Sequence, residues 1–288
     1  MKKIVFGIGL VLLLVGYFGF KMYAASVAEE RINMAIAEAS EFIDIDYEAV
    51  SVDAMGLDVR ISNVIISKLN DPEKVKIEEV VVHDIDGSSK MPLFMSVCLK
   101  GMRLENALKP NEMAQLKEFG YDENLLTDIS IDYLYDQNKK ELTINKFSGN
   151  TDNLGKVNLS MHLSNVDLNA DMTMKQFFEN EKAMVHTAEI NYTDDSFFNR
   201  IIEVEAKKAR QSPDEFRQMI TRQLDMMATK SQEDQFTQDV VAAVKNFIEN
   251  PEKFSVSVNP DKPFGFNRLK RTRDPRNLIA LLNLKVKS

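Results

Sequence analysis

The sequence is poor in the side chains from which most catalytic and metal sites are built. Its 288 residues include one cysteine, three histidines and no tryptophan. The single cysteine, Cys98, excludes an internal disulfide and has no second cysteine with which to bind a metal ion. We therefore expect Cys98 to be a small buried residue of a strand rather than a reactive thiol.

The motifs that mark common enzymes are also missing. The sequence contains no glycine-rich phosphate loop, no nucleophile elbow and no His-Glu-x-x-His stretch. His83, His162 and His186 lie in or beside predicted strands, and no two of them have the spacing of metal ligands. His83 and the nearby Asp84 and Asp86 offer ligands for a surface metal site, but Asp86-Gly87 is also typical of a turn. We expect the turn, and we predict no catalytic residue, no cofactor and no metal ligand.

Long apolar runs are scarce, and the clearest one lies at the start of the chain. Residues 4–20 carry no charge and follow Lys2 and Lys3. A helix of this length spans roughly 25 Å, which approaches the ~30 Å hydrocarbon core of a bilayer. The two lysines predict a cytoplasmic N-terminus by the positive-inside rule. We expect a transmembrane signal anchor over residues 1–28; the alternative is a cleavable signal peptide that ends near Ala24-Ala25-Ser26.

Charge of one sign dominates most of the chain. The formal net charge is −8, yet residues 262–287 hold eight basic side chains and one acidic one. The acidic remainder argues against nucleic-acid binding, which needs a clustered cationic face. The basic residues near the C-terminus indicate contact with anionic lipid or an acidic partner, or else a solvated loop; they are Arg268, Lys270, Arg271, Arg273 and Arg276.

The chain after the anchor divides by the period of its apolar residues. Residues 29–47 have helical spacing and predict an amphipathic linker helix. Residues 48–192 alternate with period two and predict a β-rich extracytoplasmic domain, interrupted by a short helix after Pro110. Strands are expected around Val50/Val52, Leu57/Val59/Ile61, Val75/Ile77, Ile129 to Tyr135, Leu142/Ile144, Val157 to Leu163 and Ala188 to Tyr192.

A short pattern recurs three times in the predicted sheet. Each copy has two alternating apolar residues, a polar residue with Asn or Gly, and two more apolar residues, over residues 59–66, 97–104 and 161–168. The alternation slips by one residue at Asn63, Gly101 and Asn165. Because Asn and Gly tolerate positive φ, the slip predicts bulged strands in a curved sheet. Chance similarity among strands is the alternative, since the spacings between copies are unequal.

Residues 193–288 change to a helical period. We expect one helix after Asp194-Asp195-Ser196, one after Ser212-Pro213 with Glu215 closing a capping box, and one that stops at Asn250-Pro251. A strand over residues 254–258, a helix near residues 274–282 and a basic tail follow. Met219, Met226 and Met227 predict either core packing or a face that adapts to acyl chains or a partner helix.

The order of parts resembles a known group of proteins. An N-terminal anchor, an amphipathic helix and residues 56–66 (Gly-Leu-Asp-Val-Arg-Ile-Ser-Asn-Val-Ile-Ile) followed by repeated strand pairs are similar to AsmA-like and YdgA-like bacterial envelope proteins. This resemblance covers residues 1–105 and 129–170. It implies an inner-membrane protein with a periplasmic β-rich body, in the AsmA-like case with an apolar groove linked to lipid transport. It implies no catalytic residue. The chain is far shorter than typical AsmA-like members and ends in helices.

The sequence therefore predicts an α+β fold: an N-terminal transmembrane helix, a curved β-rich domain of bulged antiparallel strands, and a C-terminal helical segment. The expected protein is a non-enzymatic, single-pass protein of the bacterial inner membrane whose periplasmic domain binds a lipid or an envelope protein. The alternatives are a structural accessory subunit without a ligand and a hydrolase or metal enzyme. An apolar groove would favour lipid handling, and an exposed apolar patch would favour the subunit.

Overall fold

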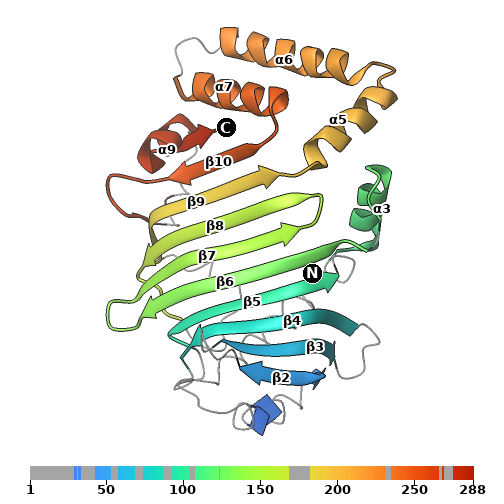
Figure 1. Ribbon diagram of the computed structural model, residues 1–288. Coiled ribbons are helices and arrows are strands. Elements are labelled where there is room, and N and C mark those ends of the chain that lie inside the picture. Colours follow the sequence, from blue (N-terminus) through green and yellow to red (C-terminus); the bar gives the residue numbers. More distant parts are fainter. Residues whose placement is uncertain are drawn as a thin grey trace.

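The computed structural model describes residues 29–30, 32–33, 43–52, 58–68, 74–86, 92–103, 108–122, 124–168, 182–230, 235–265, 268 and 275–288. These residues form one antiparallel sheet of 12 strands and five helices (Figure 1). The strands are β1 (Ile43–Asp46), β2 (Ala49–Val52), β3 (Val59–Lys68), β4 (Lys74–Ile85), β5 (Phe94–Arg103), β6 (Leu126–Asp136), β7 (Glu141–Thr151), β8 (Gly155–Ser164), β9 (Met184–Asp194), β10 (Lys253–Val258), β11 (Phe264–Gly265) and β12 (Lys285–Lys287).

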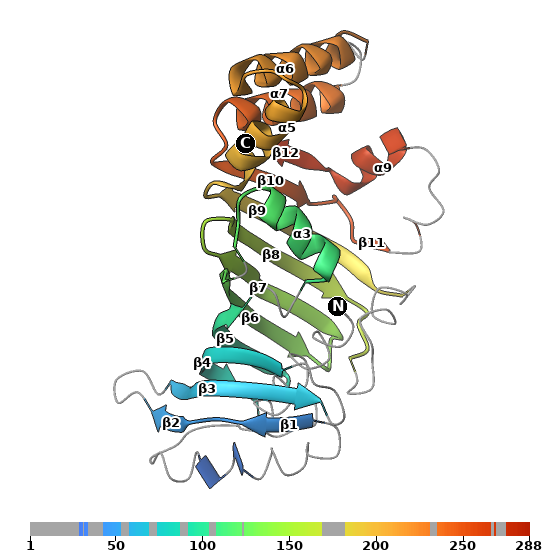
Figure 2. The ribbon, with the colours of Figure 1, turned by 90° about the vertical axis from the view of Figure 1, so that its right-hand side faces the viewer.

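The sheet is a meander in which strands that follow one another along the chain are paired. Its order is β1-β3-β4-β5-β6-β7-β8-β9-β10-β12, with β2 paired to β3 and β11 paired to β9. The helices are α3 (Pro110–Glu118), α5 (Phe197–Lys208), α6 (Pro213–Lys230), α7 (Gln235–Glu249) and α9 (Pro275–Leu282). Figure 2 shows that α5, α6 and α7 gather beyond the β10 end of the sheet. Helix α3 meets α5 through an edge-to-face contact of Phe119 and Phe197, with ring centroids 5.9 Å apart.

The C-terminal segment belongs to the sheet, which corrects the predicted fold class. Helical residues were expected to follow the β-rich domain after residue 192, with one terminal strand. Instead, β10 pairs with β9 through Phe254–Tyr192 and Val256–Ile190, and β12 pairs with β10. The alternating apolar residues of β10 and β12 are register partners of the apolar residues of β9, so pairing extends one apolar face across the three strands. The molecule is mainly one large antiparallel sheet.

The described helices also correct the predicted membrane topology. None of them is both long and apolar enough to cross a bilayer. The longest, α6, places six charged side chains among its 18 residues, in the sequence PDEFRQMITRQLDMMATK. The expected N-terminal transmembrane helix and the single-pass inner-membrane location that depended on it are therefore not supported. The anchor predicted over residues 1–28 lies outside the described residues.

Most of the other predicted elements are present. The predicted short helix after Pro110 is α3, and the three predicted helices after residue 193 are α5, α6 and α7. The predicted helix over residues 29–47 is wrong in part: residues 29–30 and 32–33 are helical, but Ile43–Asp46 is strand β1. The sequence Ile-Asp-Ile-Asp also alternates with period two, and this segment pairs with β3 from Ile43–Lys68 to Asp46–Ile65.

The three predicted slip positions have the backbone that was expected of them. Asn63, Gly101 and Asn165 have φ angles of 50°, 64° and 56°. At Gly101 the register of β5 against β6 shifts between Leu99 and Met102, so this position is a bulge as predicted. Asn63 lies within β3, where Ser62 and Val64 keep their pairing with β4, and Asn165 comes directly after β8 ends. Further register shifts in β4, β6, β7 and β8 add to the bending of the strands.

Candidate functional site: an open apolar row and a cationic hollow

A row of apolar side chains crosses ten of the twelve strands of the sheet. In each pair of neighbouring strands its members are register partners, so they point to the same face. We call this set the apolar row; from β2 to β12 it consists of Val52, Val59, Val82, Val97, Ile131, Phe147, Leu159, Ile190, Val256 and Val286. Ten strands thus contribute one aliphatic or aromatic residue each to the same line.

Burial along the apolar row stops in the middle of the sheet. Val59, Val82 and Val97 belong to the larger core cluster, which also takes in Ile32 from the short helical stretch at residues 29–33. From β7 onward the row opens to solvent: Phe147 is 45% exposed and Ile190 is 49% exposed. We call Phe147, Leu159, Ile190, Val256 and Val286 the open half of the row.

The residues beside the open half are apolar too. Gly149, Val157 and Tyr192 form the neighbouring line on the same face, and Val157 is 46% exposed. Among the residues that the structure describes, no heavy atom lies within 4 Å of the place where a Cβ of Gly149 would sit, so none of them covers this part of the face. The exposed apolar surface is therefore wider than one line of residues.

Covered apolar residues bound the open half on both sides. On one side, Tyr135, Leu142, Leu163, Val166, Ala183 and Val185 form a second buried cluster. On the other side, Phe247 of α7 packs on Phe198, Phe254 and Tyr192, with ring centroids 5.0, 5.6 and 6.1 Å apart. The open half is thus a narrow apolar strip between two packed regions.

Hydrogen bonds at the start of α5 hold the second of these boundaries in place. The Tyr192 hydroxyl donates to Asp194 Oδ1 at 2.5 Å, and the same oxygen accepts the backbone N–H of Phe198 at 3.0 Å. Burial, together with the Asp194 carboxylate, raises the pKa of Tyr192, so this phenol stays protonated and keeps donating. The helix start predicted at Asp194-Asp195-Ser196 is present: Ser196 is the N-cap residue without a side-chain capping hydrogen bond, and Asp194 accepts the N–H of Phe198 instead, which links α5 to β9.

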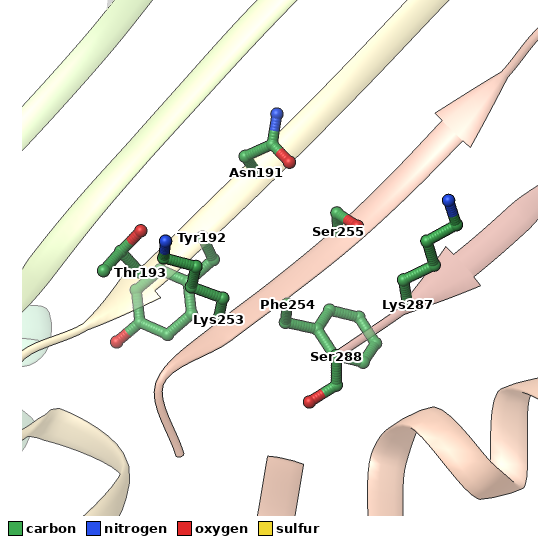
Figure 3. Close-up of a pocket in the computed structure, with 8 residues that line it drawn as sticks. All are labelled: Asn191, Tyr192, Thr193, Lys253, Phe254, Ser255, Lys287 and Ser288. Carbon is green, nitrogen blue, oxygen red and sulfur yellow. The ribbon is translucent and has the colours of Figure 1, made fainter. Parts of the chain in front are cut away.

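A hollow of about 140 Å³ lies where β9, β10 and β12 meet near the end of the chain. We call it the cationic hollow because Lys253 and Lys287 are among the residues that line it. Figure 3 shows the eight residues that line it, with Thr193 beside Lys253, and Lys287 beyond Ser255. Asn191, Ser255 and Lys287 are register partners across the three strands, and Thr193 is the partner of Lys253. These polar side chains lie on the face opposite Tyr192 and Phe254, and therefore opposite the apolar row.

The metal site considered as the alternative at His83 is not assembled from the residues named for it. His83 Nδ1 lies 3.0 Å from Asp58 Oδ1 rather than near Asp84 or Asp86. Asp86 is buried and accepts the backbone N–H of Leu93 at 3.0 Å. The turn predicted at Asp86-Gly87 extends outside the described residues. Within the described ranges, no group of three or more His, Cys, Asp or Glu side chains is placed to hold a metal ion.

A pairing of the other two histidines was not predicted. His162 and His186 stack on neighbouring strands with ring centroids 4.4 Å apart, and His186 Nε2 lies 2.8 Å from Ser164 Oγ. The register of β8 against β9 shifts after His162, which turns His186 to the same side as His162. The spacing of the two histidines along the sequence does not predict this stacking, because only the pairing of β8 with β9 brings them together.

Other predicted residues have mixed outcomes. Cys98 lies in β5 as expected but is half-buried rather than fully buried. Met226 and Met227 are 59% and 57% exposed, so these two are not core residues. Arg268 is exposed; Lys270, Arg271 and Arg273 lie outside the described residues, as does the side chain of Arg276. The predicted contact of this basic group with lipid or a partner stays a prediction.

Comparison with known proteins adds a similarity without a described function. A family model described as "Uncharacterized protein" matches residues 148–288, which include most of the open half and all of the cationic hollow. A protein of Aquifex aeolicus (strain VF5), also described as "Uncharacterized protein", is 24% identical over 301 residues, covering 98% of each chain. Neither description names AsmA-like or YdgA-like proteins, so that resemblance stays a prediction.

Proposed function

We propose that this protein is a non-catalytic binding protein that holds an acyl chain of a lipid on the open half of the apolar row. The observation that carries the proposal is the in-register apolar row whose burial ends at β7 although its apolar character continues to β12. Exposed apolar strips of this kind mark binding surfaces, since water contact with them costs free energy.

The shape of the strip favours a chain-like ligand. From β7 to β12 the open half crosses four strand intervals, which at about 4.8 Å each gives a length of roughly 19 Å. A membrane acyl chain spans about half of the ~30 Å hydrocarbon core, or about 15 Å. One extended chain can therefore lie across the strands between the two packed boundaries.

A globular partner fits this strip less well. A stable protein interface buries about 800 Å² on each side. In and beside the open half, the large side chains that are at least 45% exposed are Phe147, Val157 and Ile190, which together supply only part of that area. The accessory-subunit alternative therefore needs additional surface, whereas an acyl chain does not.

Aspartate substitutions on the two faces of the sheet test the proposal. We expect the wild-type full chain to bind a dansyl-labelled fatty acid, and Phe147→Asp and Ile190→Asp each to weaken binding at least tenfold, because the acyl chain would desolvate an unpaired carboxylate. Leu134→Asp is the matched control: Leu134 is 52% exposed on β6, between Tyr133 and Tyr135, and so faces away from the row.

The outcome distinguishes the alternatives. Circular dichroism first establishes that each variant is folded. Loss of fatty-acid binding in Phe147→Asp and Ile190→Asp but not in Leu134→Asp supports the proposal. Unchanged binding in all three folded variants, or equal loss in all three, contradicts it. If fatty-acid binding is unchanged in all variants but Phe147→Asp and Ile190→Asp alone lose a protein that co-purifies with the wild type, the protein is a structural accessory subunit and the acyl-chain proposal is rejected.

A further inference from the structure

The cationic hollow combines unpaired positive charge with unpaired hydrogen-bond donors. Within the described part of the chain, Lys253 and Lys287 make no ion pair or side-chain hydrogen bond, and neither do the side chains of Asn191, Thr193 and Ser255. None of the eight residues that line the hollow is Asp or Glu. Two ammonium groups, two hydroxyls and one amide therefore face the same small space, and no carboxylate side chain of the lining neutralises the two positive charges.

The lining of the hollow has no carboxylate side chain, although the chain has a net charge of −8. Some lysines elsewhere on the surface pair with carboxylates: Lys100 with Glu79 at 2.7 Å, Lys208 with Glu118 at 2.8 Å and Lys245 with Asp225 at 2.6 Å. On β12 itself, Lys285 lies in the row of Ser257 and Glu189, which includes a carboxylate. Lys287, two residues further on, lies in the row of Ser255 and Asn191, which are neutral.

The positions of the donors suit a small tetrahedral anion. Ser255 lies at the centre, with Lys287 and Asn191 as its partners on the two adjoining strands, and Lys253 lies two residues away on the same side of β10 (Figure 3). Register partners have Cβ atoms about 5 Å apart, so both flexible ammonium groups can reach an anion above Ser255. Lys156 of β8, the partner of Thr193, adds a third positive charge beside the hollow.

Contacts with α7 on the opposite face of the sheet hold β10 and the end of β12 in place. Asn246 of α7 donates a hydrogen bond to the Ser288 carbonyl at 3.1 Å, which holds the end of β12 against the helix. Phe254 packs on Phe247 of the same helix. Because both contacts lie on the opposite face, the donor side of the hollow is left free.

We propose that this hollow binds a phosphate monoester, with Lys253 and Lys287 neutralising its charge and Ser255, Thr193 and Asn191 donating hydrogen bonds to its oxygens. A dianion with several acceptor oxygens satisfies two cations and three neutral donors together, as a single carboxylate would not. The phosphate can belong to a lipid headgroup or to a soluble metabolite. The site lies on the face opposite the apolar row and does not depend on acyl-chain binding.

Chemical footprinting of the full chain tests the site with inorganic phosphate as the probe. Lysines are acetylated with a limiting reagent, and the labelling rate of each is measured by mass spectrometry in phosphate and in chloride of equal ionic strength. We expect millimolar phosphate to slow the labelling of Lys253 and Lys287 severalfold and to leave Lys285 unchanged. Equal slowing of all three lysines, or no slowing of any, overturns the proposal.

Variants and vesicles then identify the source of the phosphate. The double variant Lys253→Gln/Lys287→Gln should lose the thermal stabilisation that phosphate gives, and the control Lys285→Gln should keep it. Binding of the wild type, but not the double variant, to vesicles that contain phosphatidic acid identifies a lipid headgroup. Protection by glycerol phosphate without vesicle binding identifies a soluble monoester. If the double variant responds to phosphate as the wild type does, the site is excluded, whatever the result for fatty acids.

Discussion

Backbone conformation at single residues decides how the sheet bends. Gly101 combines a φ of 64° with a backbone N–H that donates to Asp128 Oδ1 at 2.9 Å, and a Cβ added there would clash with the Glu78 side chain. An L-residue in this left-handed region costs roughly 1–2 kcal/mol. The bulge of β5 therefore depends on a residue without a side chain.

Replacing Gly101 should destabilise the protein, and a second glycine provides the control. We expect Gly101→Ala to lower the free energy of unfolding by about 1–2 kcal/mol, measured from urea denaturation. Gly149→Ala should be neutral or stabilising by about 0.4–1 kcal/mol, since Gly149 does not have positive φ and has open space at its Cβ. Equal effects of the two substitutions would show that the bulge does not need glycine.

The stacked histidines make stability depend on pH. Burial lowers the pKa of His186 below its ordinary value of 6.5; the neighbouring His162 lowers it further, and Glu141 opposes this shift. Between the folded and unfolded pKa values the unfolded chain binds more protons, so stability falls as pH drops below about 6.5. His186 thus contributes a loss of stability on mild acidification.

A comparison of two pH values isolates this effect from that of the carboxylates. Urea midpoints are measured at about pH 7.5 and about pH 5.5, above the range where the carboxylates with lowered pKa values, such as Glu79, titrate. The wild type should lose more stability between these values than His186→Gln. His162→Gln should also reduce the loss, because it removes the neighbouring charge. An identical pH response in the wild type and His186→Gln would rule out His186 as the cause.

At the residue scale the sequence predicted local backbone better than contacts. The positive φ at Asn63, Gly101 and Asn165 followed from the slip in alternation, which is a property of each strand alone. The stacking of His162 on His186 and the donor set at Ser255 could not be predicted, because they depend on which strands pair and in what register.

At the scale of single elements, the capping box of α6 is a clear case in which sequence and structure agree. The Glu215 N–H donates to Ser212 Oγ at 3.3 Å, and Glu215 Oε2 accepts the Ser212 N–H at 2.8 Å. These two hydrogen bonds satisfy donors that the first turn of a helix otherwise leaves free. Pro213 follows directly as the first residue of α6.

Removal of this cap should destabilise the helix by a known amount. We expect Ser212→Ala to lower the free energy of unfolding by about 0.5–2 kcal/mol, and Ser212→Asp, which keeps an acceptor at the cap, to restore most of that loss. Chemical denaturation of the two variants measures the difference. A denaturation midpoint of Ser212→Ala equal to that of the wild type would show that the cap contributes nothing to stability.

The incorrect predictions at this scale also have a physical explanation. Ile43–Asp46 continues the helical spacing of the residues before it and also alternates with period two, so the local pattern fits both states. The choice is made by pairing with Ile65 and Ile66 of β3, which are 19 or more residues further along the chain. A window of local sequence does not contain that information.

At the scale of the whole molecule, the central feature is one sheet whose apolar row is buried from β3 to β5 and is open to solvent from β7 onward. Three helices separate β9 from β10, and no local pattern in the sequence predicts that the chain returns to the same sheet. That return extends the apolar row past β9 and also creates the cationic hollow on the reverse face. Both proposed binding surfaces therefore depend on long-range strand pairing. For this reason no local sequence motif predicts them.

The most direct measurement of the central claim is photocrosslinking of a diazirine-labelled fatty acid to the full chain, followed by peptide mapping. We expect the labels to concentrate on peptides that contain Phe147, Val157, Leu159 and Ile190, and unlabelled fatty acid to compete for these sites. Labels that concentrate instead on α6 around Met226 and Met227, or that spread evenly over the surface without competition, would contradict acyl-chain binding on the open half of the row.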